Sequence, residues 1–243
     1  MNISDPAFQL ETQITLPAGE VHLWHVNLAT VAKAEQRWED ILSAEERARA
    51  ARFHFSRDRQ YFTATRALLR TILGGYLDSD AKALRFQYSE KEKPSLTPLQ
   101  SPNSLEFNVS HSGDVALLAF ARGRDVGVDV EQLRDNFDHE AISRRFFSEH
   151  EQRQLAALAP ADRYRGFFRC WTRKEAYIKA RGTGLSLPLR EFDVSLKPCD
   201  LNALLATRPD KGEASNWALQ EVSAGEGYVA ALCVRGTGCV LRA

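Results

Sequence analysis

A pattern that recurs in both halves of the chain is the feature that most restricts its fold. A Ser-x-x-Glu sequence, typical of a helix start with a capping box, occurs at 43–46 and again at 148–151. The strand-like runs that begin at Val21 and Val126 are separated by the same number of residues as the two capping boxes. The repeated order predicts two similar lobes.

Each predicted lobe contains a strand, two helices and then further strands. An aromatic- and arginine-rich helical stretch follows each capping box, at 62–72 and 167–179. This order is typical of α+β proteins and not of a doubly wound parallel sheet. We therefore predict an α+β fold in which two lobes, residues 1–123 and 124–243, have a pseudo-twofold arrangement. Each lobe is expected to be a small antiparallel sheet packed with helices, and the active site is expected in the cleft between them.

Composition excludes several classes of protein. The 243 residues are 44% apolar and 26% charged, which is ordinary for a soluble globular chain. A net charge of zero gives no reason to expect nucleic acid as a partner, and no segment approaches the roughly 18 apolar residues that span a bilayer. The N-terminus lacks the features of a signal peptide, and the four cysteines lack Cys-x-x-Cys spacing. We expect a cytoplasmic protein with reduced thiols that binds neither nucleic acid nor membrane.

A pair of carboxylates lies on one face of a predicted strand. In Val-Gly-Val-Asp-Val-Glu, residues 126–131, the valines face one way while Asp129 and Glu131 face the other. The two carboxylates lie about 7 Å apart along the backbone, so their side chains can converge on one ion. Hard oxygen ligands of this kind suit Mg²⁺, and Gly127 leaves room for another group against the backbone. The alternative is a half-exposed strand with an acidic, solvated outer face.

A third carboxylate lies inside the most apolar face of a predicted helix. Aromatic residues between 164 and 171 form a stripe with a 3.6-residue period, and Glu175 falls within that stripe with Lys179 at its margin. A charge in such a stripe is costly unless it is paired or bound to a metal. The alternative, an exposed Glu175–Lys179 pair, contributes only about 0.3–0.5 kcal/mol. We interpret Glu175 as a third ligand to an ion held by Asp129 and Glu131, with Lys179 meeting the anionic substrate.

Ser110 and His111 lie where a strand is predicted to end at a glycine turn, in Phe-Asn-Val-Ser-His-Ser-Gly. Their side chains and backbone amides could bind phosphate oxygens. Nucleophilic hydrolysis by a Ser-His pair is disfavoured, because neighbouring strand residues point to opposite faces and no Gly-x-Ser-x-Gly elbow is present. The helical arginines after Ser43 and Phe62 add basic charge, and most of them are expected on solvated faces.

Three motifs together resemble those of the 4′-phosphopantetheinyl transferases, specifically the two-lobed Sfp-like group. The family pattern Gly-[Ile/Val]-Asp-[Ile/Val]-Glu matches residues 127–131, and Trp-x-x-Lys-Glu-[Ala/Ser]-x-x-Lys-x-x-Gly matches 171–182. The element Phe-Asn-x-Ser-His-Ser matches 107–112. The resemblance covers roughly residues 40–195, and the internal repeat fits the pseudo-twofold architecture of the family.

The resemblance implies roles for eight residues. Mg²⁺, together with the pyrophosphate of coenzyme A, would be bound by Asp129, Glu131 and Glu175. Lys179 would contact the pyrophosphate, and Glu175 would be the general base, directly or through water. The remaining contacts to coenzyme A would come from Arg49, Lys93, Ser110 and His111, the last two at the nucleotide and its 3′-phosphate.

Two positions depart from the family pattern. Residues 91–94 read Lys-Glu-Lys-Pro where the family usually has Gly-Lys-Pro, so the direction of the Lys93 side chain is not implied by the motif. Phe62 stands where some relatives have a small hydroxyl residue, and no role is transferred to it.

The reaction that the resemblance implies is transfer of the 4′-phosphopantetheine arm of coenzyme A to a serine of an apo acyl or peptidyl carrier protein. The second product would be adenosine 3′,5′-bisphosphate. Carriers for fatty acid, polyketide, nonribosomal peptide or lysine-pathway enzymes all fit the motifs. We expect a monomer, and we expect the carrier to dock near Arg144 and Arg145, which lie beside Phe146 and Phe147.

Two other functions compete with this hypothesis. A metal-dependent phosphohydrolase or nuclease could use the same acidic residues, although the neutral net charge and the absence of a basic stripe disfavour nucleic acid. A non-catalytic module that binds coenzyme A or a carrier protein is disfavoured by the intact set of Asp129, Glu131, Glu175 and Lys179.

Overall fold

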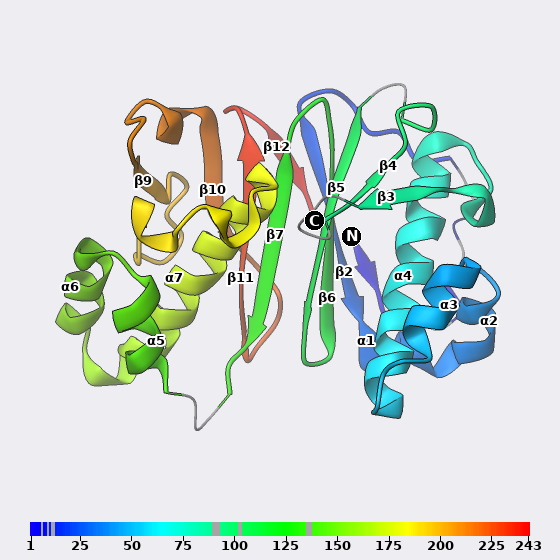
Figure 1. The fold of residues 1–243 in the computed structure, drawn as a ribbon, viewed down its shortest axis with the longest axis horizontal. Coiled ribbons are helices and arrows are strands. Elements are labelled where there is room, and N and C mark those ends of the chain that lie inside the picture. Colours follow the sequence, from blue (N-terminus) through cyan, green and yellow to red (C-terminus); the bar gives the residue numbers. More distant parts are fainter. Residues whose placement is uncertain (6, 9, 11–12, 89–92, 102–103, 135–137) are drawn as a thin grey trace.

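The computed structural model describes residues 1–243 apart from 6, 9, 11–12, 89–92, 102–103 and 135–137. Two lobes lie side by side, and their sheets face each other in the middle of the molecule while the helices cover the outer faces (Figure 1). The predicted α+β fold with two lobes is confirmed. The chain passes from the first sheet to the second at the turn that contains Gly123, between β6 (Val115–Arg122) and β7 (Val126–Gln132).

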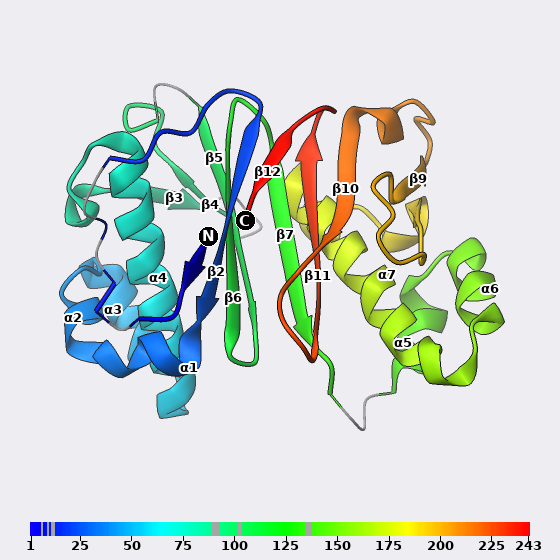
Figure 2. The same cartoon turned by 180° about the vertical axis from the view of Figure 1, so that it is seen from behind.

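The first lobe contains a five-stranded sheet with the order β1-β2-β6-β5 and with β12 paired to β2. The bounds are β1 Asn2–Ile3, β2 Glu20–Asn27, β5 Leu105–Ser112, β6 Val115–Arg122 and β12 Val240–Arg242. The sheet is not purely antiparallel as predicted, because the short strands β1 and β12 both pair parallel with β2. Both ends of the chain therefore lie near the middle of the molecule, and the last strand returns to the first lobe (Figure 2).

Helix α4, Ser56–Leu77, covers the outer face of this sheet (Figure 1). The other elements of the lobe are α1 Leu28–Val31, α2 Glu35–Glu39, α3 Ala44–Ala50 and the hairpin of β3 Phe86–Tyr88 with β4 Pro94–Leu96. The 3-10 turns are Ala32–Ala34 and Ala81–Ala83 in this lobe, and Gly184–Ser186, Leu189–Glu191 and Glu213–Asn216 in the second.

The second lobe contains an antiparallel sheet with the order β10-β11-β7. The bounds are β7 Val126–Gln132, β10 Trp217–Val222 and β11 Tyr228–Arg235. Helix α7, Pro160–Arg181, packs on the outer face of this sheet. The remaining elements are α5 His139–Phe146, α6 Glu149–Ala157, β8 Phe192–Val194 and β9 Leu204–Thr207.

The residues that the structure describes form three apolar cores, which follow from the alternation of residues along the strands. One lies between α4 and the first sheet, another between α7 and the second sheet, and the third between the two sheets. Val126, Val128 and Val130 belong to the core between the sheets. The opposite face of β7, with Asp129 and Glu131, is consequently turned toward α7, because side chains alternate along a strand.

Both predicted capping boxes are present, at Ser43 with Glu46 and at Ser148 with Glu151. Each capping carboxylate also pairs with a cation of the long helix of its own lobe. Glu46 Oε2 lies 2.7 Å from Arg70 Nε on α4, and Glu151 Oε1 lies 2.7 Å from Lys174 Nζ on α7. The repeat in the sequence thus marks the same packing of a short helix against a long one in both lobes.

The candidate active site between the lobes

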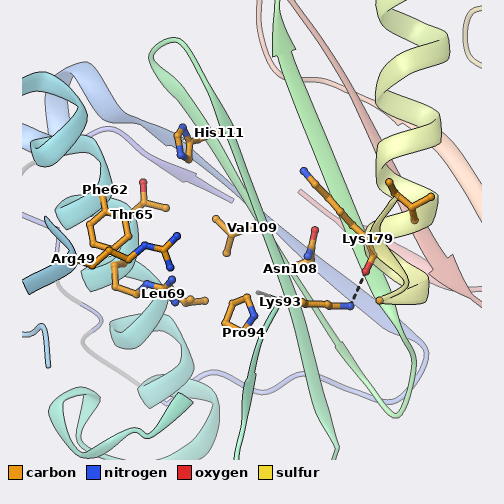
Figure 3. Close-up of a pocket in the computed structure, with 14 residues that line it drawn as sticks. Arg49, Phe62, Thr65, Leu69, Lys93, Pro94, Asn108, Val109, His111 and Lys179 are labelled. Carbon is orange, nitrogen blue, oxygen red and sulfur yellow. Dashed lines mark hydrogen bonds between the residues drawn. The ribbon is translucent and has the colours of Figure 1, made fainter. Parts of the chain in front are cut away.

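A pocket of about 330 Å³ lies between the lobes, with walls from α3, α4, β4, β5 and α7. Its lining residues are Arg49, Phe62, Thr65, Arg66, Leu69, Lys93, Pro94, Asn108, Val109, His111, Ile178, Lys179, Gly182 and Gly184. Figure 3 shows Arg49, Phe62, Thr65 and Leu69 on the side of the first lobe and Lys179 on the side of the second. The pocket therefore exists only where both lobes meet.

Asp129 is buried beside this pocket, with 4% of its surface exposed. Its Oδ1 atom lies 2.6 Å from Lys179 Nζ and accepts a hydrogen bond from Ser110 Oγ at 2.9 Å. Its Oδ2 atom is buried and has no hydrogen-bond partner among the described residues. Lys179 Nζ also donates to Ser110 Oγ at 3.1 Å and to the backbone carbonyl of Val128 at 3.3 Å. One carboxylate oxygen is thus fully engaged, and the other still requires a partner.

The three predicted acidic residues lie close enough for their charges to interact. Burial, and then the charge of Asp129, raise the pKa of Glu175 to about 7, while Lys179 acts in the opposite direction. Burial and the charge of Asp129 also raise the pKa of Glu131, which is opposed by a hydrogen bond from Ser112. Among the residues that the structure describes, no group of three or more acidic, His or Cys side chains is collected in the geometry of a metal site. The structure brings the carboxylates into one region but places Lys179 against Asp129.

Ser110 and His111 lie on opposite sides of β5. His111 is exposed and lines the pocket. Desolvation by the surrounding protein lowers the pKa of its imidazole, and the positive charge of Lys179 lowers it further. Ser110 is buried and is not part of the pocket lining. Its hydroxyl is directed at Asp129 and Lys179 instead.

Arg49 and Lys93 both line the pocket, from opposite sides (Figure 3). The Arg49 guanidinium lies 5.6 Å from the centre of the Phe62 ring. Lys93 Nζ donates to the carbonyl oxygen of Lys179 at 2.8 Å, at the end of α7, and to that of Val126 at 3.5 Å. Burial lowers the pKa of Lys93. In this structure Lys93 therefore caps α7 at the edge of the pocket.

Arg66 and Thr65 line the pocket and were not predicted as site residues. The Arg66 side chain is 11% exposed, and its Nε lies 3.6 Å from Glu46 Oε1. Its Nη1 atom and Thr65 Oγ1 are buried without a hydrogen-bond partner in the described part of the chain. The sequence could have indicated Arg66 as a pocket residue through its spacing of four residues from Phe62, which places both on one helix face.

The residues predicted to meet a carrier protein lie at the end of α5. Arg144 pairs with Glu140 at 3.4 Å, and both side chains are well exposed. The Arg145 guanidinium lies 5.1 Å from the centre of the Phe146 ring. Phe147 is completely buried in the core of the second lobe.

Comparison with known proteins identifies the family of this chain. The profile of the 4′-phosphopantetheinyl transferase superfamily matches residues 125–233, and the profile of the 4′-phosphopantetheinyl transferase N-terminal region matches residues 31–122. The chain belongs to the 4′-phosphopantetheinyl transferase superfamily, as its three motifs predicted.

Individual relatives include members of the Sfp-like group. The chain is 40% identical to the 4′-phosphopantetheinyl transferase HetI of Nostoc sp., over 93% of this chain and 92% of that protein. It is 32% identical to the 4′-phosphopantetheinyl transferase Sfp of Bacillus subtilis, over 66% of this chain and 69% of that protein. Among solved structures, the holo-[acyl-carrier-protein] synthase of Thermotoga maritima aligns with a TM-score of 0.36 at 19% identity, covering 46% of this chain and 63% of that chain.

Proposed function

We propose that the protein transfers the 4′-phosphopantetheine arm of coenzyme A to a serine hydroxyl of an apo acyl or peptidyl carrier protein and releases adenosine 3′,5′-bisphosphate. The observation that carries this proposal is the convergence of Asp129, Glu131, Glu175 and Lys179, all on family motifs, beside a basic pocket between the lobes. The names of the relatives support the same activity.

Asp129, Glu131 and Glu175 are the residues that would hold Mg²⁺ in this proposal. Two features of the site fit a cation. Asp129 Oδ2 is buried without a partner in the described part of the chain, and the pKa values of Glu131 and Glu175 are raised by burial and by neighbouring negative charge. A divalent ion prefers such oxygen ligands. When bound, Mg²⁺ would neutralise the pyrophosphate and stabilise the departing phosphate.

Positive charge on both walls of the pocket would bind the phosphates of coenzyme A. Lys179 lies at the wall next to the carboxylates, where its ammonium group would contact the pyrophosphate. Arg49 and Arg66 lie at the opposite wall, with His111 on β5 between the lobes. Charge-assisted bonds from guanidinium groups to phosphate are strong and directional. The two walls would thus hold the nucleotide end and the pyrophosphate of one extended ligand.

Glu175 would accept the proton of the carrier serine. As a carboxylate next to both the bound cation and the incoming hydroxyl, it would serve as the general base. The serine oxygen would form a bond to the β-phosphorus, and the bond from that phosphorus to the bridging pyrophosphate oxygen would break. The proton passes to Glu175, directly or through water, and adenosine 3′,5′-bisphosphate leaves.

The roles of the lobes, the carrier contact, the oligomeric state and the compartment belong to the same proposal. Residues 1–123 would supply phosphate contacts such as Arg49, while residues 124–243 supply the metal ligands and Lys179. Arg144 and Arg145 would meet the carrier, because both are exposed at the end of α5.

The proposed oligomeric state is a monomer, since one chain forms the whole pocket. The proposed compartment is the cytoplasm. No helix in the described part of the chain is long and apolar enough to cross a membrane.

Mass spectrometry of several apo carrier proteins tests the proposal. After incubation with coenzyme A and Mg²⁺, we expect a carrier that gains the mass of phosphopantetheine, together with free adenosine 3′,5′-bisphosphate. Asp129→Ala and Glu175→Gln should remove the adduct while circular dichroism shows an intact fold. Cleavage of coenzyme A without an adduct would indicate a phosphohydrolase, and binding without turnover would indicate a non-catalytic module.

A further inference from the structure

The edge of β7 that faces the first lobe is bonded to side chains of β5. On its other edge β7 forms a regular antiparallel ladder with β11. The N–H groups of Val128, Val130 and Gln132 instead donate across the lobe boundary. Their acceptors are Asn108 Oδ1 at 2.9 Å, Ser110 Oγ at 3.4 Å and Ser112 Oγ at 3.1 Å.

The match between the two strands follows from their shared period. Asn108, Ser110 and Ser112 are two residues apart and therefore lie on one face of β5. The N–H groups that they bind on β7 belong to residues that are also two apart, so successive side chains of β5 meet successive N–H groups of β7. Buried backbone N–H groups need partners, and here alternate side chains of β5 supply them at the boundary between the lobes.

Both serines also donate to a carboxylate of β7. Ser110 Oγ donates to Asp129 Oδ1 at 2.9 Å, and Ser112 Oγ donates to Glu131 Oε2 at 2.9 Å. Each serine therefore binds the carboxylate of one residue and the N–H of the next residue. This pair of hydrogen bonds occurs twice along β7, once at Asp129 and once at Glu131.

The direction of each hydroxyl proton is determined by its other bonds. A serine hydroxyl has one proton to donate and two lone pairs that accept. Ser112 Oγ accepts from Gln132 N and from Arg134 Nη2 at 3.4 Å, so its proton goes to Glu131. Ser110 Oγ accepts from Val130 N and from Lys179 Nζ, so its proton goes to Asp129. Both serines are buried, with 8% and 5% of Ser110 and Ser112 exposed.

We infer that Ser112, together with Ser110, is a positioning residue that orients the two carboxylates of β7 for the cation from across the lobe boundary. Neither serine touches the reacting atoms in this role. The inference rests on one part of the proposed function, the binding of a cation by Asp129 and Glu131, and not on the transfer reaction. Groups that hydrogen-bond metal-binding carboxylates orient them, and their loss typically lowers metal affinity or activity by about 10–100-fold.

Ser112→Thr and Ser112→Val form a matched pair for the test, because the two side chains have similar shapes and differ in the hydroxyl. Mn²⁺ binding in the presence of coenzyme A is measured by electron paramagnetic resonance, and the exchange rate of the Gln132 amide is measured by NMR without metal. We expect the Val variant to bind Mn²⁺ about tenfold more weakly than the Thr variant and its Gln132 amide to exchange faster. The KM for coenzyme A should be the same in both.

Ser112→Ala, which adds no volume, is a second variant without the hydroxyl, and Ser56→Ala, an exposed serine on α4, is the control. Equal Mn²⁺ affinity in the folded Thr and Val variants, or no saturable Mn²⁺ binding by the wild type, would overturn the inference. If the wild type modifies no carrier but the Thr and Val variants differ in Mn²⁺ affinity as expected, the proposed function fails and the inference stands.

Discussion

The backbone of Gly127 on β7 lies so close to Ala180 on α7 that a Cβ atom at Gly127 would stand 2.3 Å from the Ala180 amide nitrogen. The same atom would stand 2.2 Å from the carbonyl oxygen of Ala176. The group that lies against this glycine, for which the sequence predicted room, is the helix that carries Glu175 and Lys179. Gly127 thus sets the distance between that helix and the strand that carries Asp129.

Gly127→Ala should force α7 away from β7, because both clashes are with backbone atoms. We expect the free energy of unfolding, measured in urea, to fall by about 1–3 kcal/mol. We also expect the transfer rate to fall by more than about tenfold, because misplaced catalytic groups slow a reaction strongly. Gly212→Ala is the control, since Gly212 has a negative φ of −79° and is exposed. Equal transfer rates for wild type and Gly127→Ala would contradict the prediction.

Glu175→Gln should change how stability depends on pH. The folded protein raises the pKa of Glu175 from 4.5 to about 7, so the folded state holds this proton more tightly than the unfolded state. The wild type therefore loses stability as the pH rises through this interval, whereas the Gln variant lacks this loss. In urea titrations with a metal chelator, the variant should gain about 2 kcal/mol relative to wild type between pH 4.5 and 7. A difference that stays constant with pH would disprove this explanation.

Arg66→Gln should weaken the binding of coenzyme A. The buried Nη1 atom of Arg66 lacks a partner among the described residues. Its Nε lies 3.6 Å from Glu46 Oε1, while the other oxygen of that carboxylate, Oε2, pairs more closely with Arg70. A charge-assisted bond to phosphate is worth about 1.5–3 kcal/mol, so the KM for coenzyme A should rise at least about tenfold. Arg57→Gln, an exposed arginine on the same helix, should leave the KM unchanged. A KM for Arg66→Gln equal to that of the control would refute a role in binding.

Lys174→Met should destabilise the protein without altering the chemistry of the pocket directly. Lys174 and Glu151 have completely buried side chains, and Lys174 Nζ also donates to the carbonyl oxygens of Leu189 at 2.6 Å and Phe192 at 2.8 Å. Removal of one member of a buried ion pair leaves the other unpaired and costs about 3–5 kcal/mol. In urea unfolding, the double variant Lys174→Met, Glu151→Leu should recover part of this loss. A single variant as stable as the wild type would show that the pair contributes little.

Local patterns in the sequence determined much of the fold and part of the site. The two capping boxes and the side of β7 that carries Asp129 and Glu131 follow from spacings of three and two residues. Such features depend on neighbours along the chain, and the geometry of a helix or strand converts their spacing into a shared face.

Tertiary structure alone decided which distant side chains meet. Lys179 contacts Asp129, Lys93 caps α7, and Ser112 reaches Glu131. The pairing of β12 with β2 in the first lobe was likewise decided by the tertiary structure. These contacts join residues that are far apart in the chain, so they depend on the register of the strands and on how closely α7 approaches β7. No local spacing encodes those two quantities, because they result from the packing of the whole molecule.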